Sequence, residues 1–401
     1  MRPSPRFPSP VFHRPIAVFL AVGIAALACG PGAEPEPARS VPEVAAAAAA
    51  EVRRVIEEDG RGGAAFGIVV GGEAVAAEGF GFADTEGQTP ARADHLYRIG
   101  SITKPVTAMA MLRLVHLEKA RFGDPVTEFV PELAEVENPY SWTPGPSIFQ
   151  LATMTAGLAR EPRNLPRYLV GAPRDWLDTA LRALDEVSFE YEPGTRYQYS
   201  NIGYAMLGAA TERAAGEPFM DHVRDNLLAP LGMDSSTFFP VPELEDRIAE
   251  GVTVQDDGSL DAETPAREHA GRGYKVPNGA LYSTVEDLGV FLRFLIGTDG
   301  EPFDGVIPAS VRQDNLTKAF AAGDLASGYG FGFMTRRLED ADGNSFTAYG
   351  HGGSVAGYRA AAWIEPETDA AVVLLRNVGG DGLNLSELSL AALAEVVAAL
   401  R

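Results

Sequence analysis

Two apolar runs near the C-terminal end of the chain, residues 360–364 and 370–375, are separated only by the sequence Glu-Pro-Glu-Thr-Asp. Short apolar runs bounded by such a turn are typical of two neighbouring β-strands. Strands joined by a short turn run antiparallel, because a parallel pair needs a long crossover connection. The sequence therefore predicts one antiparallel sheet, with strands near residues 65–70, 74–82, 329–335 and 346–375.

Helical segments are expected on both sides of this sheet. The segment 44–58 should pack on the sheet, and a final helix over residues 385–400 should return to cover it. Residues 105–290 look mostly helical and should form a large lobe. With 46% hydrophobic residues, the chain can bury a large core in one unit. The predicted class is α/β (α+β), an antiparallel sheet flanked by helices with a mostly helical lobe.

Ser101 and Lys104 belong to a Ser-Ile-Thr-Lys stretch that opens an apolar segment, residues 105–117. Apolar residues at helical spacing in that segment predict a buried helix with Ser101 at its start. A spacing of three places two side chains on one helix face, so the Lys104 amine can reach the Ser101 hydroxyl. A serine needs a base to become a nucleophile, and a lysine serves when burial or nearby positive charge lowers its pKa. The pair therefore predicts a nucleophile and its base.

The start of this helix offers a further feature, because its unpaired backbone N–H groups and partial positive charge can hold an oxyanion. The alternative interpretation makes Ser101 an ordinary helix cap and Lys104 a solvated lysine. Pro105 counts against an ordinary surface helix, since proline removes a backbone donor and restricts the residue before it.

Tyr199 and Asn201 lie in a stretch, residues 192–204, that begins with a Pro-Gly turn and ends in an apolar run. This pattern predicts a loop leading into a helix. The Tyr199 phenol can exchange protons with a serine or a leaving group, and the Asn201 amide can bind a substrate carbonyl and position the lysine. Alternatively, Tyr199 packs in the core and Asn201 caps the helix that begins near Ile202.

His351 stands in a glycine-rich stretch, residues 349–358, directly before the two apolar runs. Glycines in a strand indicate that something approaches the backbone closely. We expect Gly352 and Gly353 to line an edge strand that presents N–H groups to a substrate, with His351 donating a hydrogen bond to it. The alternative is a tight hairpin that needs glycine, with His351 a polar surface residue.

The three stretches, in this order, resemble the motifs of the class C β-lactamase-like serine hydrolases, a family that includes penicillin-binding carboxypeptidases and related esterases. Other stretches of the chain resemble the framework of the same family. They are residues 98–107, 151–158, 192–208, 228–233, 279–288 and 349–377. The resemblance implies a β-lactamase-like fold with the active site between the helical lobe and one edge of the sheet.

The resemblance also implies roles for single residues. Ser101 matches the acylated nucleophile of the family, Lys104 its base partner and Tyr199 its proton shuttle. Asn201 matches the amide that positions the substrate.

Three residues near the glycine-rich strand complete the implied site. His351 and Gly353 occupy the first and third positions of the strand motif. The backbone N–H groups of Ser101 and Ser354 would form the oxyanion hole.

Two departures from the family pattern stand out. His351 replaces the lysine that β-lactamases usually carry, and an unperturbed histidine is mostly neutral at pH 7. A permanent partner for a substrate carboxylate is thereby lost, which makes efficient penicillinase activity less expected; Arg359 is a possible replacement if it faces the site. Met154 and Ala156 stand where relatives often have histidine and serine, which alters a local hydrogen-bond network.

The expected activity is two-step acyl transfer, in which Ser101 attacks the ester or amide carbonyl of a small molecule or peptide and water then releases the acyl group. We expect no cofactor and no metal, because the six histidines are scattered without the spacing of a zinc site. No Gly-x-Ser-x-Gly elbow surrounds any serine, which disfavours the α/β-hydrolase fold. The rival hypothesis is a catalytically silent, penicillin-binding-like domain that binds peptidoglycan or a protein partner.

The N-terminal segment predicts export. Basic residues precede an apolar run, residues 16–28, which is short for a membrane span and ends in small residues, so residues 1–28 are expected to form a signal peptide. Cys29 follows Ala-Leu-Ala, which looks like a bacterial lipoprotein cleavage box, although an ordinary signal peptide with an incidental cysteine is the alternative. Lipidation at Cys29 would attach the protein to a membrane of the bacterial cell envelope.

Residues 29–43, rich in Pro, Ala and Glu, would then be a tether, and residues 44–401 the catalytic domain. The net charge of −22 argues against a nucleic-acid partner, because phosphate binding needs a basic surface. Without Cys29 the domain has no cysteine and so no disulfide.

Overall fold

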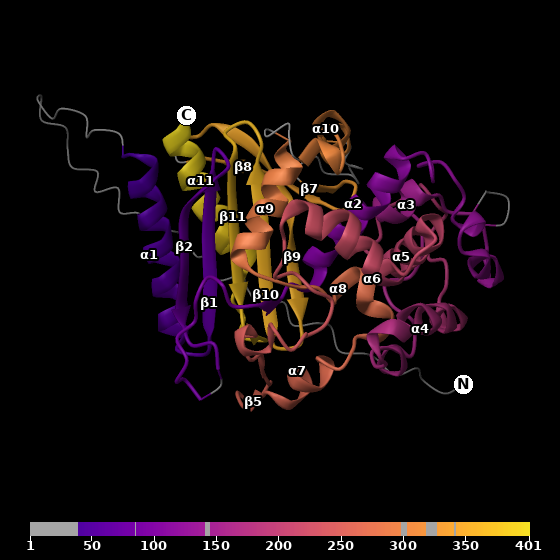
Figure 1. The fold of residues 1–401 in the computed structure, drawn as a ribbon, viewed down its shortest axis with the longest axis horizontal. Coiled ribbons are helices and arrows are strands. Elements are labelled where there is room, and N and C mark those ends of the chain that lie inside the picture. The colour runs from indigo at the N-terminus through magenta and orange to yellow at the C-terminus, as the bar shows by residue number, and fades with distance from the viewer. Residues whose placement is uncertain (1–38, 85, 141–144, 298–302, 318–326, 341) are drawn as a thin grey trace, which may run out of the picture. The chain divides into compact units, whose positions relative to one another are not determined.

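The antiparallel sheet is the central layer of the fold (Figure 1). A computed structural model describes residues 39–401 apart from 85, 141–144, 298–302, 318–326 and 341. Among these residues, seven strands pair antiparallel in the order β2-β1-β11-β10-β9-β8-β7. They are β1 Gly63–Val70, β2 Glu73–Gly81, β7 Ser327–Tyr329, β8 Met334–Glu339, β9 Ser345–Val355, β10 Tyr358–Glu365 and β11 Ala370–Arg376.

Two strands that are far apart in the sequence, β1 and β11, are neighbours in this sheet. β1 pairs with β11 from Ala64 opposite Arg376 to Val70 opposite Ala370. The two apolar runs of the sequence form β10 and β11, which pair with each other through the predicted turn. The sheet is therefore complete only when segments from both ends of the chain are in place.

The central strands are buried on both faces, and successive side chains enter two different cores. Trp363 and Leu374 face one core, whereas their neighbours Ala362 and Val373 face the other. This alternation follows from the period of two along a strand. Because both faces are covered, these strands read as nearly continuous apolar runs in the sequence.

Helices α1 (Val41–Asp59) and α11 (Leu385–Leu400) pack together on one face of the sheet, as predicted for two terminal helices (Figure 1). α1 begins at Val41, three residues before the expected residue 44. The reason is local: the Glu43 carboxylate accepts a hydrogen bond from the Ser40 backbone N–H at 2.8 Å and caps the first turn.

Helices α2 (Thr103–His116), α5 (Asn201–Ala215) and α9 (Val285–Ile296) belong to the core on the other side. α9 packs on β1 and β11, while α2 and α5 pack on each other inside the lobe. The remaining helices are α3 Ile148–Ala152, α4 Trp176–Ala183, α6 Phe219–Val223, α7 Glu263–Glu268, α8 Val276–Gly279 and α10 Ala309–Thr317. Short strands complete the fold: β3 Tyr97–Arg98, β4 Val252–Val254, β5 Leu260–Asp261, β6 Tyr282–Ser283 and β12 Val378–Gly379.

One predicted strand, residues 329–335, is wrong as a single element. β7 ends at Tyr329 and β8 begins at Met334, with a tight turn between them. Gly330 N donates to the Phe333 carbonyl at 2.7 Å, and Gly332 adopts a left-handed φ of 92° that breaks the strand. The turn is apolar, with Phe331 and Phe333 both buried, which is why the sequence pattern concealed it.

The predicted signal peptide and Cys29 lie outside the described residues. Across the described part of residues 39–401, no helix is both long enough and apolar enough to cross a bilayer.

Leu374→Ala should lower the free energy of unfolding by about 2–5 kcal/mol, because it removes buried methyl groups and leaves a cavity. Leu374 is fully buried in the core beneath α1 and α11. Leu260→Ala, the same change at a side chain that is 54% exposed, should alter the free energy of unfolding by less than about 0.5 kcal/mol. Urea unfolding of both variants measures the difference, and equal losses would contradict this placement of Leu374.

Candidate active site

Ser101 and Lys104 face each other at the start of α2. Ser101 lies in the 3₁₀ turn Gly100–Ile102 that leads into the helix, and Lys104 lies in the first helical turn. The Lys104 Nζ is 3.0 Å from the Ser101 Oγ and donates to the Asn278 carbonyl oxygen at 2.8 Å. Lys104 is completely buried, whereas Ser101 is partly exposed. Lys104 is therefore not the solvated lysine of the alternative interpretation.

The surroundings of Lys104 favour its neutral form. Burial lowers the pKa of the Lys104 amine well below its ordinary value, and the positive charge of Lys275 lowers it further. Glu161 acts in the opposite direction, and Arg160 lowers the pKa again. A neutral amine 3.0 Å from a hydroxyl can accept its proton, which is what activation of Ser101 requires.

Tyr199 lies beside both Ser101 and Lys104. The Lys104 Nζ is 4.9 Å from the centre of the Tyr199 ring, and the Arg160 guanidinium lies over that ring at 4.8 Å. Burial raises the pKa of the Tyr199 phenol above its ordinary value, although a hydrogen bond with Ser101 opposes the shift. A phenol that remains protonated beside the serine can donate a proton.

The loop that carries Tyr199 is held by Met154, one of the departures from the family pattern. The Ser200 N–H donates to the Met154 sulfur at 3.2 Å, and the Gln198 N–H donates to the Met154 carbonyl at 2.8 Å. Met154 is buried and has a left-handed φ of 59°, which is uncommon for a residue with a side chain. A thioether and a carbonyl thus secure this loop.

Ser200, and not Asn201, caps α5. The Ser200 hydroxyl accepts a hydrogen bond from Gly203 N at 2.9 Å and donates to the Ala159 carbonyl at 2.7 Å. The helix begins at Asn201, one residue before the expected start. The alternative prediction that Asn201 caps this helix is therefore wrong.

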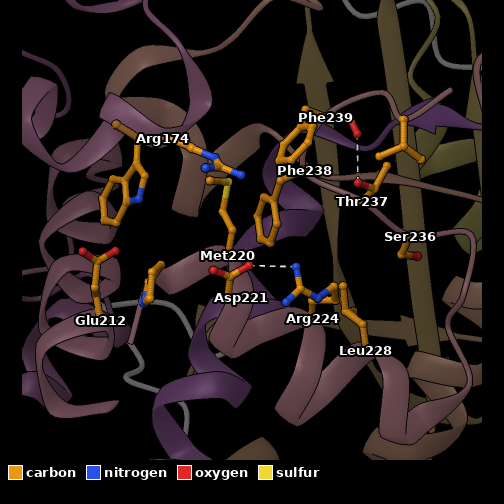
Figure 2. A pocket seen from close by; sticks show the side chains of 13 residues that line it. Arg174, Glu212, Met220, Asp221, Arg224, Leu228, Ser236, Thr237, Phe238 and Phe239 are labelled. Atoms are coloured by element: carbon orange, nitrogen blue, oxygen red, sulfur yellow. Dashed lines mark hydrogen bonds and ion pairs between the residues drawn. The ribbon is translucent and has the colours of Figure 1, made fainter. Parts of the chain in front are cut away.

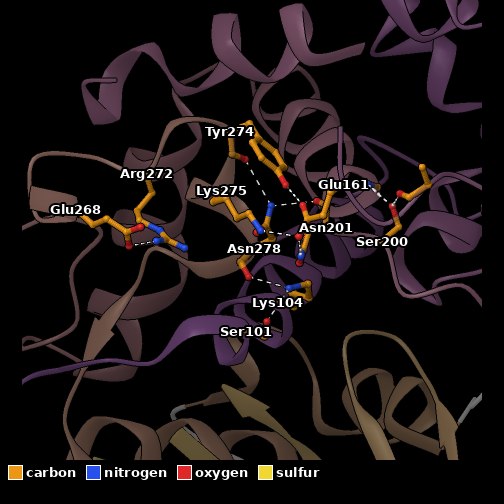
Figure 3. Close-up of polar contacts among 12 residues, drawn as sticks. Ser101, Lys104, Glu161, Ser200, Asn201, Glu268, Arg272, Tyr274, Lys275 and Asn278 are labelled. Atoms are coloured by element: carbon orange, nitrogen blue, oxygen red, sulfur yellow. Dashed lines mark hydrogen bonds and ion pairs between the residues drawn. The ribbon is translucent and has the colours of Figure 1, made fainter. Parts of the chain in front are cut away.

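Asn201 belongs to a buried polar cluster beside Lys104 (Figure 3). Its amide donates to Glu161 Oε1 at 2.6 Å, and Lys275 Nζ donates to the same oxygen at 2.7 Å. The Tyr274 hydroxyl donates to the other oxygen of this carboxylate. Burial alone would raise the pKa of Glu161, but Lys275 and the hydrogen bonds outweigh it, so the pKa is lowered and the carboxylate is charged.

The lysine is positioned by a residue that the sequence analysis did not single out. Asn278 holds the Lys104 amine through its carbonyl, and its own side-chain amide donates to the Asn201 carbonyl at 3.0 Å. Asn201 was expected to position Lys104 directly with its side chain. In the structure it acts through its backbone and Asn278, while its side chain is engaged by Glu161.

Gly353 and Ser354 lie against the turn that carries Ser101. A side chain on Gly353 would overlap the Ile99 carbonyl oxygen, and a Cβ on Gly100, whose φ is 52°, would be 2.7 Å from Ser354 N. The two glycines thus allow the backbones of β9 and the Ser101 turn to touch. This approach places Ser354 next to the turn that carries Ser101, and both residues line the same cleft.

The edge-strand prediction for this region needs one correction. β9 is an interior strand, because β8 pairs with it as far as Met334 opposite Gly350. Beyond Gly350 it continues to Val355 while β8 has ended, so only its last residues present an open edge. The predicted edge exists locally, next to Ser101.

His351 is buried and neutral. Burial lowers its pKa to about 3, and the nearby Lys104 contributes to the same shift. Its Nδ1 donates to the Gly352 carbonyl at 2.6 Å, and its Nε2 is 3.3 Å from the Tyr329 hydroxyl. Both nitrogens therefore have protein partners, so the surface-residue alternative is wrong and the expected hydrogen bond to a substrate is not prepared.

Ser101 opens onto a cleft of about 480 Å³. Arg160 and Arg359 line it, which answers whether Arg359 faces the site. The other lining residues are Tyr197, Tyr199, Met334, His351, Gly352, Gly353, Ser354, Ala360, Leu383, Asn384, Leu385 and Ser386. Asn201 is not among them.

Glu161, Lys275 and Arg160 were also missed by the sequence analysis. Arg160 and Glu161 lie in an irregular segment and Lys275 lies in the short 3₁₀ turn Gly273–Lys275, so no periodic pattern marks any of them as functional. Arg160 and Glu161 directly follow the framework stretch 151–158, which was the available signal. No cluster of three or more His, Cys, Asp or Glu residues suited to a metal occurs among the described residues.

Residues 48–394 match the protein family described as Beta-lactamase. Esterase EstB from Burkholderia gladioli is 29% identical over 339 residues, which cover 76% of this chain and 83% of the esterase. Penicillin-binding protein 4 from Amycolatopsis lactamdurans is 28% identical over 292 residues, 71% of this chain and 73% of that protein. The solved structure of an octameric penicillin-binding protein homologue from Pyrococcus abyssi has a TM-score of 0.72 and 25% identity, covering 88% of this chain and 77% of the other.

Lys275→Met should raise the pKa of Lys104, because it removes a cation that lowers this pKa while the Glu161 carboxylate, which raises it, remains. Labelling of Ser101 by a fluorophosphonate requires the neutral amine, so the labelling rate should rise with pH. The midpoint of this rise should lie at a higher pH in the variant than in the wild type. Lys119→Met, the same change at an exposed lysine, serves as the control. A shift to lower pH, or none, would contradict Lys104 as the base.

Proposed function

Because the chain belongs to the Beta-lactamase family, we propose that it is a serine hydrolase that cleaves ester or amide bonds through an acyl-enzyme at Ser101. The fold and the family expected from the three sequence stretches are both confirmed. The observation that carries the proposal is the 3.0 Å contact between the Ser101 hydroxyl and a buried lysine amine.

The first step is attack by Ser101 on the carbonyl carbon of the substrate. Lys104 accepts the hydroxyl proton as the new C–O bond forms, since its lowered pKa leaves the amine neutral. The N–H groups of Ser101 and Ser354 stabilise the oxyanion of the tetrahedral intermediate.

Collapse of this intermediate breaks the bond to the leaving group, which takes a proton from the Tyr199 phenol. The protonated Lys104 amine, 4.9 Å from the centre of the Tyr199 ring, then returns a proton to the Tyr199 oxygen. The raised pKa of the phenol keeps it protonated, and so able to donate, at neutral pH. Water then attacks the acyl-enzyme with the same groups acting in reverse, and Ser101 is regenerated.

His351 is neutral, so a cation for a substrate carboxylate has to come from another position in the cleft, that of Arg359. On this difference from the β-lactamases rests the preference for esters and peptides over β-lactams. A histidine with a pKa of about 3 carries no positive charge at pH 7 and cannot replace the lysine that β-lactamases use at this position. The similarity to esterase EstB is consistent with this preference. The rival function, a silent domain that binds peptidoglycan or a protein, has no need for the prepared Ser101, Lys104 and Tyr199 geometry.

Ser101→Ala should lower turnover of a short-chain p-nitrophenyl ester by about 10³-fold or more, because no acyl-enzyme can form. The wild-type protein should turn over a chromogenic cephalosporin far more slowly than the ester. Ser259→Ala, at an exposed serine, is the matched control. Equal ester rates in wild type and Ser101→Ala would remove Ser101 as nucleophile and favour the silent domain, and rapid cephalosporin turnover would contradict the esterase preference.

The site of action proposed from the sequence is the bacterial cell envelope, with a lipid anchor at Cys29. The support is the run of basic, apolar and small residues that precedes this cysteine. The chain has a single cysteine, so its modification can be tested without interference from others.

Cys29→Ser should move the protein from the membrane fraction of a bacterial host to the soluble fraction, because thioether attachment of lipid requires the sulfur. Fractionation followed by immunoblotting measures the distribution, and metabolic labelling with a fatty acid detects the anchor. A variant that stays in the membrane fraction would show that another segment holds the protein there.

A further inference from the structure

The active-site cleft has a charge opposite to that of the protein. The chain carries a net charge of −22, with 55 acidic and 33 basic residues. Nevertheless, no Asp or Glu lines the cleft among the described residues, whereas two arginines do. A positive cleft in an acidic protein concentrates anionic molecules at the site and repels cations.

Arg160 lies on the Tyr199 ring, with its guanidinium carbon 4.8 Å from the ring centre. It is exposed, and no described carboxylate forms an ion pair with it. The adjacent acid, Glu161, is directed to Lys275, Tyr274 and Asn201 and does not neutralise it. The guanidinium is therefore free to bind a ligand beside the phenol.

Arg359 reaches the cleft from β10, opposite Ser354 in the sheet register. It donates to the Ser354 hydroxyl, and no described carboxylate pairs with it either. The partner hydroxyl is neutral, so the positive charge of Arg359 stays uncompensated. The two arginines come from the helical lobe and from the sheet, so the cleft has a cation on each wall.

A second cavity, in the helical lobe, contains an arginine whose charge is paired (Figure 2). This cavity of about 370 Å³ is lined by Arg224 among others. Arg224 donates to Asp221 at 2.7 Å and to Asp225 at 2.6 Å, so its charge is compensated within the protein. The uncompensated arginines of the Ser101 cleft differ from it in this respect.

We propose that the substrate is a doubly anionic ester or amide, one anionic group bound by Arg160 and the other by Arg359. The inference rests on the proposed Ser101 chemistry and specifies its substrate class. Guanidinium groups bind carboxylates and phosphates through paired N–H donors, so either anion satisfies the geometry. The scissile carbonyl lies between the two anionic groups, next to Ser101.

Four phenyl esters test this proposal. The acyl group is either neutral acetyl or anionic hemisuccinyl. The leaving group is either neutral methyl 4-hydroxybenzoate or anionic 4-hydroxybenzoate. The four combinations carry no charge, one charge on the acyl side, one charge on the leaving-group side, or two charges. Each kcat/KM is divided by the rate of hydroxide-catalysed hydrolysis of the same ester. Each anionic group should raise this ratio by about five- to tenfold at low salt, and the gain should shrink as ionic strength rises.

Arg160→Gln and Arg359→Gln should each lose the preference for one anionic group, and the two variants should lose different ones. Arg167→Gln is the matched control, because Arg167 also lies over a tyrosine ring, that of Tyr168 at 5.6 Å, but does not line the cleft. Its preferences should equal those of the wild type.

The neutral ester separates this inference from the proposed function. If Ser101→Ala hydrolyses it as fast as the wild type, the proposed function fails. If its hydrolysis depends on Ser101 but the anionic esters are not preferred, or if both arginine variants keep the preference, the substrate class is wrong and the acyl-enzyme proposal stands. A phosphonate in place of the carboxylate on the acyl group then identifies which anion binds better.

Discussion

The buried amine of Lys104 is the constraint to which the rest of the site conforms. An ammonium ion in a fully buried position costs several kcal/mol unless a carboxylate compensates it. The nearest acid in this network, Glu161, is bound by Lys275, Tyr274 and Asn201, and Lys275 adds a positive charge of its own. Burial and this charge lower the pKa of the amine and favour its neutral form, and its hydrogen-bond partners are a carbonyl oxygen and the Ser101 hydroxyl.

The sheet supplies the second requirement, a backbone that can touch the Ser101 turn. β9 and β10 are fixed between two apolar cores, so the end of β9 beyond Gly350 is held by packing and not by a partner on its open edge. Gly353 and Gly100 then let the two backbones meet. The helical lobe presents the amine and the phenol, and the sheet presents the end of β9 with Gly353 and Ser354, so the cleft needs both parts of the fold.

Much of this arrangement could be predicted from local pattern. The Ser101 and Lys104 contact follows from helical spacing, and the apolar runs 360–364 and 370–375 predicted the sheet. Asn278, 174 residues beyond Lys104, could not be predicted, because its role depends on how the loop before it folds back. The burial of His351 was also missed, since its partner Tyr329 lies on a short strand that the sequence pattern had merged with the next one.

The pairing of β1 with β11 has a consequence for the order in which the protein can fold. Residues 64 and 376 are neighbours in the sheet although 312 positions separate them in the chain, and α1 packs on α11 at the two ends. Contacts of such long sequence separation require costly loop closure, so they form slowly and late. A ribosome-bound chain that lacks β11 leaves one hydrogen-bonding edge of β1 unpaired. The protein must therefore be released, or kept from aggregation, before its core can close.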